Sequence, residues 1–207
     1  MPPAFHAMVV SLITGLFFFA LLAVLVRLVI QWRGNDPRSP LAIASDHGAV
    51  WAATVGWVLI LGAVITGFTM WAPSAAFNSP IMRNKLLTSL LLVVTYALFI
   101  GMRWYLRDRI WRNKLLSAFY VMVAFAGFHW SAVTNSIGGD IAGIPSGYET
   151  IVALSGVDTR FTYYLPTWVL VVIAAISVGI LTLAFLGGSD PEPTREDRRT
   201  EVGRVER

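Results

Sequence analysis

Five long apolar stretches constrain this chain more than any other feature. They cover residues 4–30, 48–71, 86–102, 115–133 and 166–186. Each is close to the ~20 residues that a helix needs to cross the hydrocarbon core of a bilayer. Only 14% of the 207 residues are charged and 56% are hydrophobic, whereas soluble domains carry about 25% charge. The sequence therefore predicts an all-α integral membrane bundle of five transmembrane helices.

The basic residues predict how this bundle is oriented. Five spans alternate the connecting segments between two sides of the membrane. Outside the C-terminal segment, one side receives Arg27, Arg33, Arg38, Arg103, Arg107, Arg109, Arg112 and Lys114, and the other receives only Arg83, Lys85 and Arg160. Because cytoplasmic loops carry the excess of Arg and Lys, we expect the N-terminus outside and the C-terminus in the cytoplasm. The same placement argues against nucleic acid as a partner.

Two segments lie outside the predicted spans. Residues 136–165 contain several glycines but also many aliphatic side chains, which free linkers lack. We expect them to form an ordered cap over the outer face. Residues 189–207 mix both charge signs with two prolines, so we expect a disordered cytoplasmic tail, or a strand that binds a partner.

Several kinds of chemistry are excluded or disfavoured by the composition. There is no cysteine, which excludes disulfides and cysteine-ligated clusters. No Asp, Glu or Lys stands at mid-depth in a predicted span, and ion-coupled carriers usually need such a group. No phosphate loop or zinc-protease helix is present. An enzymatic activity of the chain alone is therefore not indicated.

Two histidines are the sharpest candidates for a binding site. His6 lies just inside the outer end of the first span, and His129 lies in the outer half of the fourth. Two facing histidines on different helices are the ligands of a b-type haem. Ideal-helix counting puts their depths about 5–8 Å apart. Gly127, Ala124 and Ala126 would leave space for a flat ring. The alternative is that His129 hydrogen-bonds Asn135, Ser131 or a carbonyl of a neighbouring helix and binds nothing.

The remaining soft or titratable side chains give weaker signals. His47 follows Ser45 and Asp46, a typical helix start, at the cytoplasmic end, where it could lie near a quinone head group. Met8, Met70 and Met82 stand at outer ends near His6. Thioethers with imidazole suit copper(I), but methionine is also common filler in helices, so copper is disfavoured.

The first 150 residues resemble a family of small bacterial membrane proteins. The opening Pro-Pro-Ala-Phe-His-Ala-Met is similar to the family's His-Pro…Val-His-Phe-Pro start, with His6 at the second histidine and no counterpart of the first. Thr66-Gly67-Phe68 with Trp71 resembles the end of the family's second span, and Gly138-Gly139 the turn after its fourth. The family consists of four-helix membrane domains that are sometimes fused to Rieske or cytochrome modules. The resemblance implies a redox setting in a bacterial inner (plasma) membrane.

Two hypotheses follow for the function. In the first, the chain is the membrane subunit of an electron-transfer complex of a respiratory chain, with one haem b between His6 and His129 and an extracytoplasmic redox protein as partner. In the second, it is a cofactor-free accessory or anchoring subunit that packs against the other subunits of a larger membrane complex. Lipids surround it in both.

Overall fold

Helices are the only regular elements among the described residues. The computed structural model describes residues 3–34, 36–70, 74, 78–144, 148, 150, 153–154 and 167–187. The helices are α1 (Pro3–Trp32), α2 (Pro40–Met70), α4 (Pro80–Leu106), α5 (Arg109–Arg112), α6 (Lys114–Ile141) and α8 (Thr167–Gly187). The all-helical class is thus confirmed for this part of the chain.

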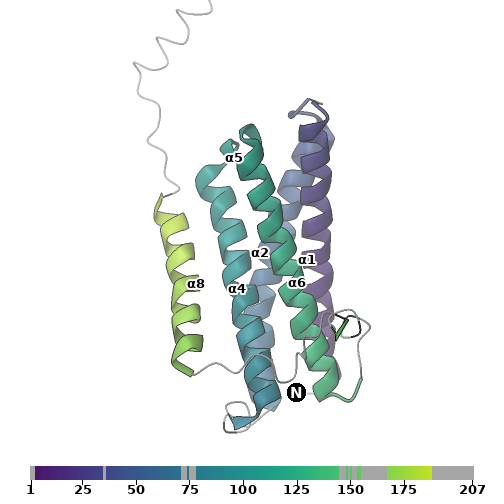
Figure 1. The fold of residues 1–207 in the computed structure, drawn as a ribbon, viewed down its shortest axis with the longest axis vertical. Coiled ribbons are helices and arrows are strands. Elements are labelled where there is room, and N and C mark those ends of the chain that lie inside the picture. Colours follow the sequence, from purple (N-terminus) through teal and green to yellow (C-terminus); the bar gives the residue numbers. More distant parts are fainter. Residues whose placement is uncertain are drawn as a thin grey trace, which may run out of the picture.

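Helices α1, α2, α4 and α6 form a four-helix bundle (Figure 1). Each packs against two others, so that α1 and α4 stand on opposite corners with α2 and α6 between them. Successive long helices run antiparallel, and α5 covers one end of the bundle. Helix α8 packs mainly against α4, at the edge. The bundle therefore has two distinct ends, which we call the α5 end and the His6 end.

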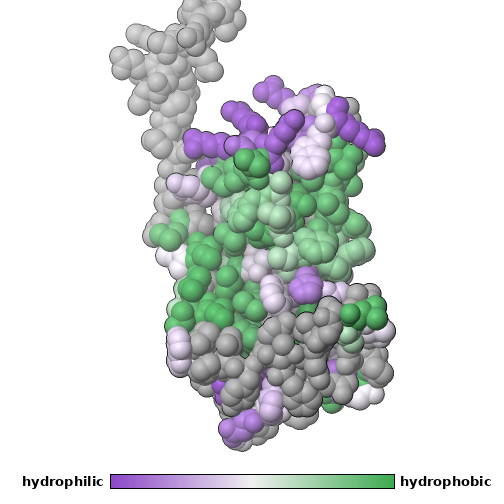
Figure 2. Space-filling model, viewed as in Figure 1, coloured by the Kyte–Doolittle hydropathy of each residue, from purple (hydrophilic) through white to green (hydrophobic). Residues whose placement is uncertain are grey.

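The exterior of the bundle suits lipid. Helices α1, α2, α4 and α6 are long and apolar enough to cross a membrane. Large apolar side chains are exposed on their outward faces, such as Trp51 at 70%, Ile65 at 66% and Phe125 at 62%. Figure 2 shows the resulting hydrophobic band, with hydrophilic side chains gathered at the α5 end. In α8 the described apolar stretch, Val171–Ile180, is shorter than a span, so the fifth crossing stays a prediction.

Three helices extend well beyond the apolar stretches that predicted them, and α4 does so at both ends, since it covers Pro80–Leu106 instead of 86–102. Helix α2 begins at Pro40, eight residues before the predicted start, and its first turn is capped by Ser39, whose hydroxyl accepts a hydrogen bond from the Ala42 amide at 3.3 Å. The predicted helix start at Ser45 and Asp46 was therefore wrong. Both residues lie within α2 and their side chains are buried, and hydrogen bonds offset the cost of burying them.

Helix α6 likewise continues to Ile141. The first six residues of the predicted outer cap are its last turns, and Gly138 and Gly139 are helical instead of forming a turn. The chain turns at Gly143, where φ is +74°, a conformation that glycine adopts without steric cost. Most of the remaining cap, and all of the predicted tail at 189–207, lie outside the described residues.

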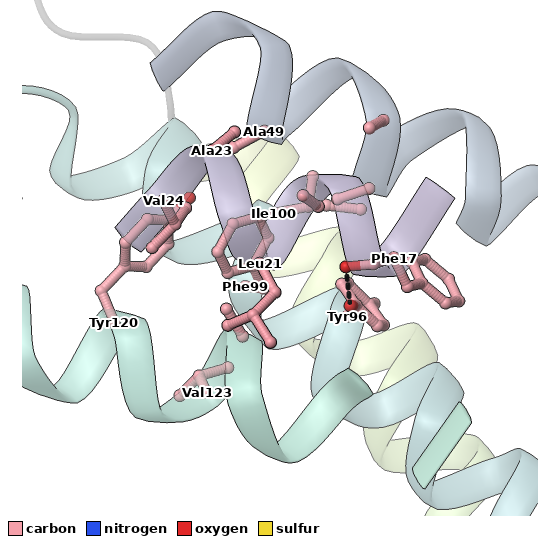
Figure 3. Packing of buried hydrophobic residues seen from close by; sticks show 14 of the residues in the cluster. Phe17, Leu21, Ala23, Val24, Ala49, Tyr96, Phe99, Ile100, Tyr120 and Val123 are labelled. Carbon is pink, nitrogen blue, oxygen red and sulfur yellow. Dashed lines mark hydrogen bonds between the residues drawn. The ribbon is translucent and has the colours of Figure 1, made fainter. Parts of the chain in front are cut away.

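An aromatic layer fills the middle of the bundle (Figure 3). The rings of Phe17 and Tyr96 stack with centroids 3.6 Å apart, and the Tyr96 hydroxyl donates to the Phe17 carbonyl at 3.4 Å. Glycines make room on both sides: a Cβ at Gly56 would lie 2.6 Å from the Phe17 ring, and one at Gly127 would lie 2.7 Å from the Tyr96 ring. This layer thus crosses all four helices, and Phe99 continues it toward the α5 end.

Candidate functional site

Contacts between the antiparallel helices fix which residues share a level in the bundle. On α1 and α6, Thr14 lies beside Ser131 and Phe18 beside Phe128. On α1 and α2, His6 bonds Thr66. The same register places a charged group at the α5 end and a neutral polar group at the His6 end, with the aromatic layer between them. Each end is a candidate site.

The charged group at the α5 end is centred on Asp46. Its carboxylate accepts hydrogen bonds from the Arg103 guanidinium, the shortest at 2.6 Å from Nη2, and from the Trp111 indole Nε1 at 3.0 Å. Asp46 and Trp111 are 6% and 3% exposed. The network therefore joins α2, α4 and α5 through charge-assisted bonds in a buried setting, where such bonds are strong.

Arg27 of α1 completes this end of the bundle. It is 5% exposed, and its guanidinium carbon lies 4.9 Å from the centroid of the Trp111 ring, which is within cation–π distance. The Gln31 amide, one turn further along α1, donates to the Trp111 carbonyl. Trp111 is thus held from three sides, and it fixes α5 over the end of the bundle.

Sequence reasoning missed this group. It assigned Asp46 to a helix start and Arg27 and Arg103 to the positive-inside pattern, which concerns location and not pairing. One signal was available: Asp46, seven residues into an unbroken helical stretch after Pro40, lies about two turns inside the helix. A carboxylate at that depth needs a basic partner on another helix.

His6 is oriented by Thr66 at the opposite end. Its Nδ1 lies 2.9 Å from the Thr66 hydroxyl oxygen, which also lies 3.0 Å from the Ala63 carbonyl of its own helix. Because a carbonyl only accepts, both contacts are satisfied together when Thr66 donates to Ala63 and His6 Nδ1 donates to Thr66. In that tautomer Nε2 is the unprotonated nitrogen and carries a lone pair.

His129 makes a hydrogen bond to the segment that follows α6. Its Nδ1 lies 2.5 Å from the Tyr148 hydroxyl, and its ring contacts the neighbouring Trp130 edge-on. Burial raises the pKa of the Tyr148 phenol above its ordinary value, so this hydroxyl is neutral at physiological pH. The predicted alternative named other residues as the hydrogen-bond partner, and Tyr148 was not among them.

The register separates the two histidines along the bundle. His129 is level with residue 16 or 17 of α1, because Thr14 and Phe18 flank that position against α6. His6 lies about ten residues nearer the end of α1, or ~15 Å along the axis at 1.5 Å per residue. The expected 5–8 Å was too small. The axial ligands of one haem approach the same iron from opposite sides, so this pair does not fit a shared haem.

The space that was expected to hold a flat ring beside Gly127 is filled by the ring of Tyr96. Ala124 is fully buried in the same core. The small residues on α6 therefore do accommodate a flat ring, but it belongs to the protein.

The other candidate residues are not brought together. His47 is exposed beside the buried Asp46. Met8 is 60% exposed, and the side chain of Met70 lies outside the described part of the structure. Within the described residues, no three His, Cys, Asp or Glu side chains are close enough to hold a metal ion. The quinone and copper sites stay untested.

The His6 end holds further polar side chains inside the bundle. Asn84, Thr88 and Ser136 are at most 1% exposed. Lys85 of α4 extends over α6, with its Nζ 3.1 Å from where a Cβ at Gly138 would lie. Arg83 of α4 and Asp140 of α6 also lie at this end, so charged side chains stand here beside neutral hydroxyl, amide and imidazole groups.

No protein family, curated protein or solved structure matches the chain.

Proposed function

We propose that the chain is an accessory or anchoring subunit of a larger membrane complex, with no cofactor of its own. It crosses the plasma membrane five times, with its N-terminus outside. The observation that carries this proposal is the aromatic layer: stacked Phe17 and Tyr96 fill the bundle interior from Gly56 to Gly127. A bundle closed in this way offers its outer faces to other subunits and to lipid.

Site-specific photo-crosslinking tests the proposal. A photoreactive residue replaces Ile65 on α2, Phe125 on α6 or Val178 on α8, which are all more than 60% exposed. In membranes of the native host, we expect at least one of these positions to crosslink to the same protein in constant yield. Phe99, fully buried, is the matched control and should give no product. Crosslinks to lipid alone from all three exposed positions, with a monomeric chain in mild detergent, would refute the proposal.

A second candidate function rests on His6. Its Nδ1–H is held by Thr66 and its Nε2 lone pair is available, which is how metal-ligating histidines are usually oriented. This favours a redox role in which His6 ligates haem b and an extracytoplasmic redox protein exchanges electrons with it. His129 is the partner ligand that this hypothesis names, although the register disfavours that pairing.

An absorption spectrum of the protein purified from its own host separates the two functions. A haem subunit shows a Soret band that His6→Ala or His129→Ala abolishes while membrane insertion is kept. An accessory subunit is colourless. The orientation is tested separately, by fusing a reporter that is active only in the cytoplasm to the C-terminus. A well-expressed but inactive fusion would contradict an odd number of spans.

A further inference from the structure

The α5 end holds more positive than negative charge in its buried interior. Arg27 and Arg103 face a single buried carboxylate, that of Asp46. The second carboxylate near Arg103, Asp108, is 78% exposed and 3.4 Å away. Buried charges in proteins are normally paired. One buried cation therefore lacks a counter-ion among the described residues.

The carboxylate of Asp46 is already used by its neighbours. Its Oδ1 accepts from Arg103 Nε at 3.2 Å and from the Trp111 indole, and its Oδ2 accepts from Arg103 Nε at 3.1 Å and Nη2 at 2.6 Å. No ion pair joins it to Arg27 within 4.0 Å in the described structure. The unmatched cation is thus Arg27.

One guanidinium nitrogen of Arg27 is buried without a hydrogen-bond partner in the described structure. This nitrogen is Nη1, and the Trp111 ring covers one face of the guanidinium. Tyr120 carries a second such donor: its hydroxyl is buried without a partner in the described part of the chain, and its ring stands edge-on to Trp111 with the centroids 5.7 Å apart. Leaving a charged donor unsatisfied in this way is costly.

We propose that Arg27 binds a phosphate oxyanion at this end of the bundle, with the Tyr120 hydroxyl as a second donor. The guanidinium fork matches the geometry of phosphate oxygens. Exposed Arg33, Arg109 and Arg112 surround this end and attract anions. Trp32 and Tyr105, 57% and 62% exposed, mark the interfacial depth at which lipid phosphates lie. The phosphate comes either from an anionic phospholipid or from the aqueous phase.

Binding measurements on the full-length chain test this site. Calorimetry in phosphatidylcholine nanodiscs uses inorganic phosphate as the probe. Native mass spectrometry of chain released from phosphatidylglycerol nanodiscs detects retained lipid. We expect one ligand per chain in one of the two arms. The arm that responds identifies the source of the phosphate.

Three variants assign the binding to the proposed donors. Arg27→Gln removes the charge and should weaken binding by about tenfold or more, because bonds to charged groups contribute about 1.5–3 kcal/mol. Arg33→Gln, exposed in the turn that follows the same helix, is the matched control and should weaken binding much less. Tyr120→Phe keeps the packing and should cause a smaller loss. Absence of binding in both arms, or an equal loss in Arg33→Gln, would overturn the proposal.

Discussion

The two ends of the bundle both hold polar side chains between helices, but they do so with different kinds of interaction. At the α5 end the polar atoms form one charged network in which Asp46 and Trp111 each contact several partners. At the His6 end, His6 with Thr66 and Ser131 with Thr14 form two separate neutral pairs. Removing one member of the network leaves a buried charge without its partner, whereas removing one member of a neutral pair affects only the other hydrogen-bonding group.

The largest expected effect is therefore the loss of the Asp46 charge. Asp46→Asn leaves Arg103 with only the exposed Asp108 as a counter-ion, at 3.4 Å, and weakens the acceptor for Trp111. Breaking a buried ion pair from one side typically costs about 3–5 kcal/mol. We expect a loss of that size in the free energy of unfolding, measured by reversible denaturation in mixed micelles.

A double variant distinguishes stranded charge from lost packing. Asp46→Asn with Arg103→Gln removes both charges, and we expect it to recover at least half of the lost stability. Asp36→Asn is the matched control, because Asp36 is exposed and bonds only the nearby Arg38 amide at 2.9 Å. If the double variant is no more stable than Asp46→Asn alone, the network is not held by its charges.

This network shows where prediction from the sequence ended. Apolar stretches located the four bundle helices, because a lipid-facing helix must be apolar over its whole length. They could not place the helix ends, since Asp46 and Ser136 lower the hydropathy of turns that remain helical. Whether those side chains find hydrogen-bond partners depends on residues of other helices. The sequence of one span does not show which residues of its neighbours lie against it.

The second-largest effect concerns the layer that separates the two ends. Gly127→Ala would place a methyl group 2.7 Å from the Tyr96 ring, and overpacking of this kind costs about 1–3 kcal/mol. Gly15→Ala is the control, because nothing lies within 4 Å of its added carbon; its stability should not fall. A Gly127→Ala variant as stable as the native chain would show that the layer is loosely packed.

The relative depths of the two candidate haem ligands could not be derived from the sequence for the same reason. His6 and His129 were both correctly expected on the bundle helices, but counting from uncertain helix ends made their depths similar. The contacts of Thr14 and Phe18 with α6 set the true offset, and no feature of the sequence encodes that register. Equally, the lack of a side chain at Gly127 indicated space for a flat ring, but it did not indicate whether that ring belongs to a cofactor or to the protein.

A small effect is expected from the neutral pair at the His6 end. Thr66→Val keeps the side-chain shape and removes the bond to His6. Interhelical hydrogen bonds in membranes average about 0.6 kcal/mol, so the unfolding free energy should fall by about that amount. Thr54→Val is the matched control, because its hydroxyl bonds only the Val50 carbonyl of its own helix. A loss as large as that of Asp46→Asn would remove the contrast between the two ends.

The smallest effect concerns Tyr148, which contacts His129 from the segment after α6. Burial raises the pKa of this phenol in the folded chain, so folding favours its neutral form. The associated stability is fully present below the ordinary tyrosine pKa of about 10 and is lost as the pH rises through the higher folded value. Subtracting the absorbance titration of Tyr148→Phe from that of the native chain isolates this group. We expect its midpoint above that of free tyrosine, because a tyrosinate in this position would lose solvation. A midpoint at or below the free value would mean that Tyr148 is solvated and does not hold His129 in place.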